Sequence, residues 1–448
     1  MGNHAWEGTA LHNIGLVYNN QSQYEQALDF YQQALAISRE VGNRVGEGTT
    51  LIGIGLVYNN QNQYEQALEF YQQALTIIRE VGDRAGEGVT LNNIGHVYDN
   101  LSQYEQALAF YQQALIIYRE VGNRAGEGTT LSNIGAVYSK QSQYEQALDF
   151  YQQALTIRRE VGDRYGEGLT LYRIGFAYRD LEQYEQAISF LQQSLIIDRE
   201  LGRRTDEGIT LYQIGLTYAR WNQYEQAIEY YQQSLAIRRE VGDRAGEALT
   251  LGNLRHLYAN QGSYGEALEY YQQELNVYRA LGDRTREAEA LHGIGFYHWR
   301  LGQYARSLVA YEQALEIRVA LGERANQALT LNNIGSAYRD QGKYLPAINA
   351  YREALDIFNA LSNQRNQIVV ITNMSRAFAQ QGEAAQAIEH LEQASSLFPA
   401  VDNSASLLIR FTSALKDIRE SAGEAVYQEH CQSTATTLGV SVAEVCSE

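Results

Sequence analysis

The 448-residue chain has only two prolines and two cysteines. Pro346 and Pro399 leave nearly the whole length free of the residue that most strongly interrupts helices. Cys431 and Cys446 do not make a disulfide framework in so long a chain, so a reducing cytoplasm is the expected location. No apolar run approaches the length of a membrane span, and Met1–His4 has neither the basic nor the apolar part of a signal peptide. We therefore expect a cytoplasmic protein that does not span a membrane.

Positive charge is also scarce, because 35 Lys and Arg face 53 Asp and Glu for a net charge of −18. This balance speaks against nucleic acid or an anionic membrane as the main partner. The eight histidines contain no HExxH motif and no pair four residues apart, so no metal site is predicted. Gly53-x-Gly55 lacks the third glycine of a dinucleotide fingerprint, and Gly126-Glu-Gly128 lacks the lysine of a phosphate loop. We predict that the protein is not an enzyme and has no catalytic residue, cofactor or metal.

What the sequence contains instead is a repeat with a period of forty residues. Val121–Glu160 reappears almost unchanged as Val81–Glu120 and Val161–Glu200, and the register holds without insertion from Met1 to about Ala400. A fixed period of this length indicates a solenoid, in which each unit buries its apolar face against its neighbours. We predict ten repeats, residues 1–40, 41–80, 81–120, 121–160, 161–200, 201–240, 241–280, 281–320, 321–360 and 361–400. Residues 401–448 are expected to form a C-terminal capping helix or helices and a frayed tail.

Each repeat is predicted to be a helical hairpin. In the fourth, apolar residues at helical spacing over Leu131–Tyr138 indicate a first helix, and those over Tyr144–Leu155 indicate a second. Ser142 and Glu145 read as a capping box that starts the second helix. Gly162 supplies the left-handed residue that ends it.

The pattern Leu131-x-x-Ile134-Gly135-x-x-Tyr138 followed by Ala147-x-x-x-Tyr151-x-x-Ala154 resembles the tetratricopeptide repeat. Two features depart from the usual pattern: the period is forty residues and not about 34, and Arg159 stands where proline is common. The longer form is similar to the arrays of kinesin light chain, of Pins-type polarity adaptors, and of bacterial proteins with signalling NTPase or protease domains. The resemblance implies an all-α fold, a right-handed solenoid of ten helix-turn-helix hairpins plus C-terminal capping helices, with first helices lining a concave groove. It implies a scaffold and not a particular chemistry.

Most of the 34 tyrosines occupy the three repeat positions of Tyr138, Tyr144 and Tyr151, and we expect all three to pack in the core. Arg255 breaks the repeat, because it stands where nearly every other copy has glycine at the close contact between helices. A residue that violates a local pattern indicates function or strain. A small splaying of that hairpin is the alternative.

The candidate binding residues come from variable positions of the first helices. Positions such as Thr129, Asn133, Ala136 and Lys140 form a stripe separate from the core stripe. From residue 161 onward this stripe and its neighbours acquire aromatic and arginine side chains, which suit a peptide with acidic and apolar anchors. An ordinary solvated inner surface is the alternative. The predicted site residues are Tyr172, Arg173, Phe176, Arg179, Tyr212, Gln213, Leu216, Arg220, Asn253, His256, Phe296, Arg300, Asn333 and Arg339.

We therefore predict a non-catalytic scaffold or adaptor that binds a partner peptide or segment in the groove, centred on repeats five to eight. One alternative is the sensor or regulatory arm of a larger signalling protein whose NTPase or protease domain is absent from this chain. Another is a self-assembling array. The first hairpin keeps the apolar residues of interior copies, so either the chain is a piece of a longer protein or this end packs against something, such as a second copy.

Overall fold

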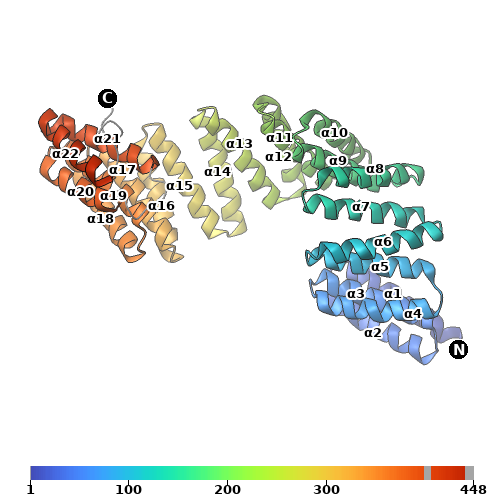
Figure 1. Ribbon diagram of the computed structural model, residues 1–448. Helices are drawn as coiled ribbons and strands as arrows, with labels where there is room; N and C mark the ends of the chain where they lie inside the picture. Colours follow the sequence, from blue (N-terminus) through green and yellow to red (C-terminus); the bar gives the residue numbers. More distant parts are fainter. Residues whose placement is uncertain (1, 398–404, 439–448) are drawn as a thin grey trace. The chain divides into compact units, whose positions relative to one another are not determined.

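The computed structural model describes residues 2–397 and 405–438, and every element in them is an α-helix (Figure 1). Residues 398–404 and 439–448, which contain part of the predicted tail and Cys446, lie outside the described residues. The chain divides into two compact units, Met1–Ile237 and Arg238–Glu448. No helix within the described ranges is both long and apolar enough to cross a bilayer.

First and second helices of successive hairpins alternate along the chain. The helices up to the division are α1 (Gly2–Asn20), α2 (Tyr24–Glu40), α3 (Arg44–Asn60), α4 (Tyr64–Glu80), α5 (Arg84–Asn100), α6 (Tyr104–Glu120), α7 (Arg124–Lys140), α8 (Tyr144–Glu160), α9 (Arg164–Asp180), α10 (Tyr184–Glu200), α11 (Arg204–Arg220) and α12 (Tyr224–Val241), which continues past it. Those that follow are α13 (Arg244–Asn260), α14 (Tyr264–Leu281), α15 (Arg284–Arg300), α16 (Tyr304–Ala320), α17 (Arg324–Asp340), α18 (Tyr344–Ala360), α19 (Gln364–Gln381), α20 (Ala384–Leu397), α21 (Ala405–Ala422) and α22 (Glu424–Leu438).

The turns show one correct and one wrong prediction about helix ends. Gly162 follows the end of α8 with φ 73°, so the left-handed glycine is confirmed. The capping box is wrong: Gln143 precedes α8 without a side-chain hydrogen bond to it. Ser142 has φ 60° because it closes the turn after α7, where a left-handed residue is needed. The side-chain caps stand before first helices instead, as where Asp163 accepts a hydrogen bond of 2.9 Å from the backbone N–H of Gly166.

The core lies between the two helices of each hairpin and between consecutive hairpins. Tyr151 is 2% exposed, and a Cβ built on Gly135 would lie 2.7 Å from its ring, so the predicted close contact at glycine is confirmed. Tyr138 and Tyr144 are only half-buried, and Tyr138 stacks on Phe150 with ring centroids 5.4 Å apart. The position of Tyr151 is therefore the fully buried one, and the other two lie nearer the surface.

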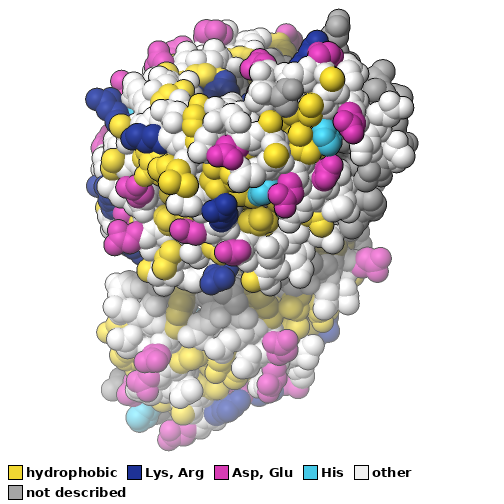
Figure 2. All heavy atoms as spheres, turned by 90° about the vertical axis from the view of Figure 1, so that its left-hand side faces the viewer, with side chains coloured by type: hydrophobic (Ala, Val, Ile, Leu, Met, Phe, Trp, Pro, Cys, Tyr) yellow, Lys and Arg dark blue, Asp and Glu magenta, His cyan; other side chains and the backbone are white. Residues whose placement is uncertain are grey.

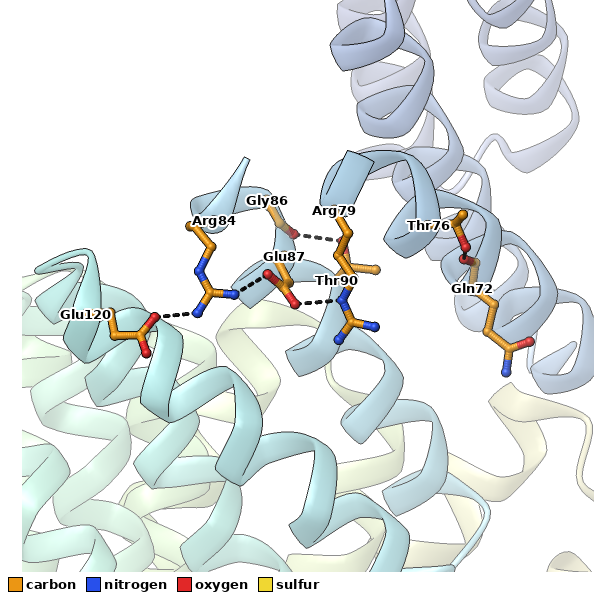
Figure 3. A network of polar contacts seen from close by, with 8 residues as sticks. All are labelled: Gln72, Thr76, Arg79, Arg84, Gly86, Glu87, Thr90 and Glu120. Carbon is orange, nitrogen blue, oxygen red and sulfur yellow. Dashed lines mark hydrogen bonds and ion pairs between the residues drawn. The ribbon is translucent and has the colours of Figure 1, made fainter. Parts of the chain in front are cut away.

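An ion-pair network fastens the ends of neighbouring hairpins. Arg79 Nε donates to Glu87 Oε1 at 2.7 Å, and Arg84 donates to both Glu87 and Glu120 (Figure 3). The same series of ion pairs among four residues recurs as Arg39–Glu47–Arg44–Glu80, Arg119–Glu127–Arg124–Glu160 and Arg159–Glu167–Arg164–Glu200. Burial alone would raise the pKa of Glu87, but hydrogen bonds and charge from the two arginines outweigh it and hold the pKa below its ordinary value. Arg159, in place of the usual proline, thus has a structural role.

These carboxylates predict an acid-sensitive array. A carboxyl whose pKa is lower in the folded than in the unfolded state stabilises the fold above its unfolded pKa, and this stabilisation is lost as the pH falls through the folded value. The direction is the same for Glu47, Glu87, Glu127 and Glu167. Replacing these four by glutamine is expected to reduce the loss of thermal stability between about pH 5 and about pH 3. A matched control replaces the exposed residues Glu65, Glu105, Glu145 and Glu185, and an equal reduction there would contradict the assignment.

The hairpin of α13 and α14 accommodates Arg255 through a buried polar cluster. Arg255 Nε donates to Glu274 Oε2 at 3.0 Å, and its Nη1 donates to the Tyr271 hydroxyl at 3.0 Å. The Tyr271 ring lies toward α15, where a Cβ on Gly293 would be only 2.3 Å from it. Glu274, which is 5% exposed, also accepts a hydrogen bond of 3.1 Å from the Tyr278 hydroxyl. Arg255 stands at the position of glycine and Glu274 at that of a small residue in other repeats, and these two changes compensate each other.

The helix α21 covers the last repeat hairpin. Phe411, Leu415 and Ile418 are fully buried in one cluster with Met374 and Phe378 of α19. Because α21 supplies an apolar face to a hairpin that has no following repeat, the core continues into it.

Candidate functional site

The predicted site residues fall in both compact units, so each set is described by itself. In the N-terminal unit they lie on two first helices, with Tyr172, Arg173, Phe176 and Arg179 on α9 and Tyr212, Gln213, Leu216 and Arg220 on α11. In the C-terminal unit they lie on three first helices, with Asn253 and His256 on α13, Phe296 and Arg300 on α15, and Asn333 and Arg339 on α17.

Five side chains of α9 and α11 form one network. The Arg179 guanidinium carbon lies 4.0 Å from the centroid of the Phe176 ring, which is a cation–π contact. Arg179 Nε lies 3.2 Å from Asp180 Oδ1, and its Nη1 donates to Gln213 Oε1. Arg220 Nη1 donates to the same Asp180 oxygen at 2.8 Å. The network joins the two helices at their C-terminal ends, and Arg220 is its exposed cation.

Other candidates of this unit are held by internal contacts. Arg173 Nη1 donates to the Ser132 carbonyl at 3.1 Å and to its hydroxyl at 2.9 Å, on the neighbouring helix α7. Tyr212 is 8% exposed, because its ring packs on Tyr231 with centroids 5.4 Å apart. Whether the candidate residues also contact a partner stays a prediction.

Two candidates of α13 and one of α15 lie among local partners. The His256 Nε2 atom is 3.0 Å from Asn260 Nδ2, and Asn253 Nδ2 donates to the Leu249 carbonyl at 3.0 Å. Arg300 Nη2 donates to the Tyr264 hydroxyl at 2.8 Å, and its guanidinium carbon lies 5.0 Å from the centroid of that ring. These contacts turn Arg300 toward the preceding hairpin.

A cavity of about 380 Å³ brings the remaining three candidates together. Phe296, Asn333 and Arg339 all line it. Its walls come mainly from the first helices α15, α17 and α19, and they also include Trp299, Leu329, Asn332, Val369, Asn373 and Arg376. Apolar, amide and guanidinium groups therefore meet in one space.

The amide side chains of this cavity form a neutral polar ladder. Asn373 Nδ2 donates to Asn332 Oδ1 at 2.9 Å, and Asn332 Nδ2 donates to Asn333 Oδ1 at 3.3 Å. Asn333 Nδ2 lies 3.1 Å from Nε2 of His292, outside the cavity. Burial and, less strongly, the charge of Arg318 lower the pKa of His292 to about 4, so this imidazole is neutral near neutral pH.

Arg339 brings an incompletely bonded cation to the cavity. It is 7% exposed, and its Nε and Nη2 atoms both lie 2.8 Å from Asp340 Oδ1. Trp299 Nε1 donates to the other oxygen of that carboxylate at 2.8 Å. Arg339 Nη1 is buried without a hydrogen-bond partner among the described residues. An oxygen atom of a ligand in the cavity would supply the missing acceptor.

The last repeat and α21 contribute residues that were not among the predicted ones. Arg376 occupies the stripe position of Ala136 and Phe296, so following that position one repeat further would have found it. It donates to Asp417 Oδ2 on α21 at 2.6 Å, and Arg410 of the same helix also lines the cavity. No pattern of the repeat could have indicated Arg410, because it lies beyond the last copy.

Charge on the face nearest the C-terminal helices is mixed. Figure 2 shows basic, acidic and apolar side chains interspersed there without a large area of one sign. Recognition by charge on that face therefore depends on individual groups. Within the described ranges, no group of three or more His, Cys, Asp or Glu side chains could hold a metal ion.

A family model described as the tetratricopeptide repeat matches residues 6–80, 86–160, 167–240, 246–320 and 326–400. Among solved structures, the chain is similar to BtubC (BKLC) from P. vanneervenii at 17% identity and a TM-score of 0.46, over 49% of this chain and 92% of that one. It is similar to aspartyl phosphate phosphatase F from Bacillus subtilis at 17% identity and a TM-score of 0.46, over 79% and 94%. A signal transduction ATPase with a tetratricopeptide repeat sensor from Pyrococcus horikoshii gives 13% identity and 0.46, over 82% and 51%. No curated protein matches the sequence, and these TM-scores are too low to support a conclusion about function.

Proposed function

Because this chain belongs to the tetratricopeptide repeat family, we propose that it is a non-catalytic adaptor that binds a segment of a partner protein. Tetratricopeptide repeats generally mediate protein–protein interactions. The binding face in this proposal is the one made by first helices, and its strongest contacts lie in the cavity between α15, α17 and α19.

The observation that carries this proposal is that Arg339, a wall residue of that cavity, has a buried Nη1 atom without an acceptor among the described residues. A buried donor without a partner costs about 1–3 kcal/mol, which a carboxylate or carbonyl oxygen of a ligand would recover. Phe296 and Leu329 are 39% and 38% exposed and offer apolar surface beside it. The asparagine ladder offers donors and acceptors to an extended main chain. An acidic residue flanked by apolar ones is the segment that fits these groups.

In the N-terminal unit, Phe176 and Arg220 supply a second set of apolar and cationic contacts. This set and the candidates of α13 and α15 are proposed binding residues that belong to repeats five to eight. The cavity extends them into repeats nine and ten through Asn333, Arg339 and Arg376.

Self-association and a role as the regulatory arm of a signalling protein stay predictions. Exposed apolar residues of α1 favour self-association, since Trp6 is 78% and Val17 is 53% exposed. Exposed apolar side chains of this size are covered in many proteins by a partner surface.

A selection from a phage library of random dodecapeptides tests the proposed function. We expect enriched peptides to combine acidic and apolar residues and to bind more weakly as salt increases, because opposite charges are screened. The double variant Phe296→Ala/Asn333→Ala is expected to weaken the best peptide about tenfold in a fluorescence anisotropy titration. Neither residue is fully buried, so the fold should persist.

The matched control is Leu345→Ala/Asn359→Ala, which removes an exposed apolar residue and an exposed asparagine from the second helix α18. It should leave the affinity unchanged. Equal weakening by both double variants, or none by either, would place the peptide elsewhere and contradict the proposal.

A further inference from the structure

One repeat position near the end of each second helix carries side chains of very different length. The residues at this position, forty apart, are Ser38, Ile78, Tyr118, Arg158, Asp198, Arg238, Tyr278, Arg318 and Phe358. Most are large side chains, and three of them are arginines.

Two of these arginines lie directly on the first turn of the following helix. A Cβ built on Gly166 would be 1.6 Å from Arg158 Nη1, and one built on Gly246 would be 2.0 Å from Arg238 Nη1. Both side chains are nearly buried, at 11% and 7% exposure. A guanidinium therefore occupies the space between the end of these two second helices and the next first helix, where the facing residue is glycine.

The third arginine shows the partners of a guanidinium in this space. Arg318 Nη1 donates to the Asn326 carbonyl at 3.1 Å and to the Thr330 hydroxyl, and it lies 3.1 Å from His292 Nδ1. Three repeats earlier, the positions of Asn326, Thr330 and His292 are occupied by Asp206, Thr210 and Tyr172, respectively.

Asp198 leaves this space open in the N-terminal unit. A cavity of about 230 Å³ lies between α9, α10 and α11, and its walls include Asp198, Asp206, Thr210 and Tyr172. Tyr165, Leu169 and Ile209 add aromatic and aliphatic surface. The residues that would surround a guanidinium are thus present, while the chain supplies a carboxylate in place of the arginine.

A second short side chain at the same repeat position also borders a cavity. Ser38 lines a cavity of about 210 Å³ together with His12, Val45 and Thr50. Among the described residues, no Asp or Glu lines it. The protein thus contains a neutral cavity that matches the acidic one.

The carboxylate of Asp198 is buried and accepts a hydrogen bond from Thr210. It is 7% exposed, and Thr210 Oγ1 donates to its Oδ2 atom at 2.8 Å. Burial raises its pKa, although Thr210 and the charge of Arg203 act in the opposite direction. Arg203 itself pairs with Asp206 and stacks on Tyr165, with its guanidinium carbon 4.1 Å from the ring centroid. A cation beside Asp198 would offset the cost of burying that charge.

We propose that the cavity at Asp198 binds an arginine side chain of the partner segment, in the place that Arg318 fills three repeats later. The guanidinium would pair with Asp198 and would share Asp206 with Arg203, and its methylene stem would pack on Leu169 and Ile209. Because the arginine belongs to a partner segment, this inference rests on the proposed function and adds a basic anchor to the acidic and apolar ones.

A titration with acetyl-Gly-Arg-Gly-amide tests the cavity alone, by methyl NMR of the full chain labelled at Ile, Leu and Val. We expect the methyl signals of Leu169 and Ile209 to shift, while that of Val45 in the neutral cavity does not. The same tripeptide with citrulline, which has the shape of arginine without its charge, should bind about tenfold more weakly or not at all.

Two variants complete the test. Asp198→Asn keeps the side-chain shape and should abolish the shifts, and Asp198→Arg should fill the cavity as Arg318 fills its space and abolish them too. Asp149→Asn, an exposed residue of α8, should bind as the wild type does. No shift at Leu169 and Ile209 in the wild type, or equal binding by Asp198→Asn, would overturn the inference. Since the tripeptide contains no acidic anchor, this outcome is separate from failure of the cavity around Arg339.

Discussion

Replacing Tyr151 with alanine is expected to destabilise the hairpin of α7 and α8 by about 3–5 kcal/mol, through lost burial plus the cavity that remains. The ring is 2% exposed and lies against Gly135, where no side chain can move in to fill the space. In a repeat array this loss is local, because each repeat contacts only its neighbours. Hydrogen exchange of the amides of α7 and α8 measures it directly.

Tyr138→Ala is the matched control for this prediction. Tyr138 belongs to the same hairpin but is half-buried and stacked on Phe150, so we expect a smaller loss of about 1–2 kcal/mol. Equal losses for the two tyrosines would mean that their different burial does not determine their contribution.

Replacing Arg255 with glycine should destabilise the hairpin of α13 and α14 by about 3 kcal/mol, since it strands the buried carboxylate of Glu274. Burial already raises the pKa of Glu274, and Arg255 counteracts this. Without Arg255 the folded-state pKa rises further above the unfolded one. The loss of folding stability caused by this buried charge is then present above the unfolded pKa of Glu274. It becomes smaller as the pH falls and the carboxyl binds a proton.

The double variant Arg255→Gly/Glu274→Ala restores residues that other repeats have at these two positions. Tyr271 can then pack on glycine as Tyr151 does on Gly135. We expect it to recover most of the stability lost in Arg255→Gly, with a coupling free energy of about 2 kcal/mol from the exchange of α13 and α14 amides. A double variant no more stable than Arg255→Gly would show that the two residues do not depend on each other.

The period and its apolar stripes predicted the hairpins well, because a helix stripe depends only on spacing along the chain. That spacing does not show how deeply each side chain is buried. Tyr138 and Tyr151 both lie on apolar stripes, yet only the second meets a glycine of the facing helix. The capping box failed for a similar reason, since Ser142 satisfies the motif but is needed in the turn that ends α7.

The candidate site shows the same limit. The stripe positions and their neighbours indicated Phe296, Asn333 and Arg339, which the structure brings to one cavity. They gave no sign that Arg173 bonds to Ser132 or Arg179 to Gln213, because those contacts depend on how neighbouring hairpins are placed. The cavity at Asp198 was missed because the sequence shows a charge at that position but not the space that a short side chain leaves.

The central claim is that a partner segment binds on the face made by the first helices. A nitroxide-labelled peptide from the library selection tests it most directly through paramagnetic broadening of methyl signals. The account predicts broadening at Leu329 of α17 and Val369 of α19, and none at Val309 of α16 and Leu345 of α18, although the last two are exposed. Broadening of Val309 and Leu345 with sharp signals at Leu329 and Val369 would contradict it.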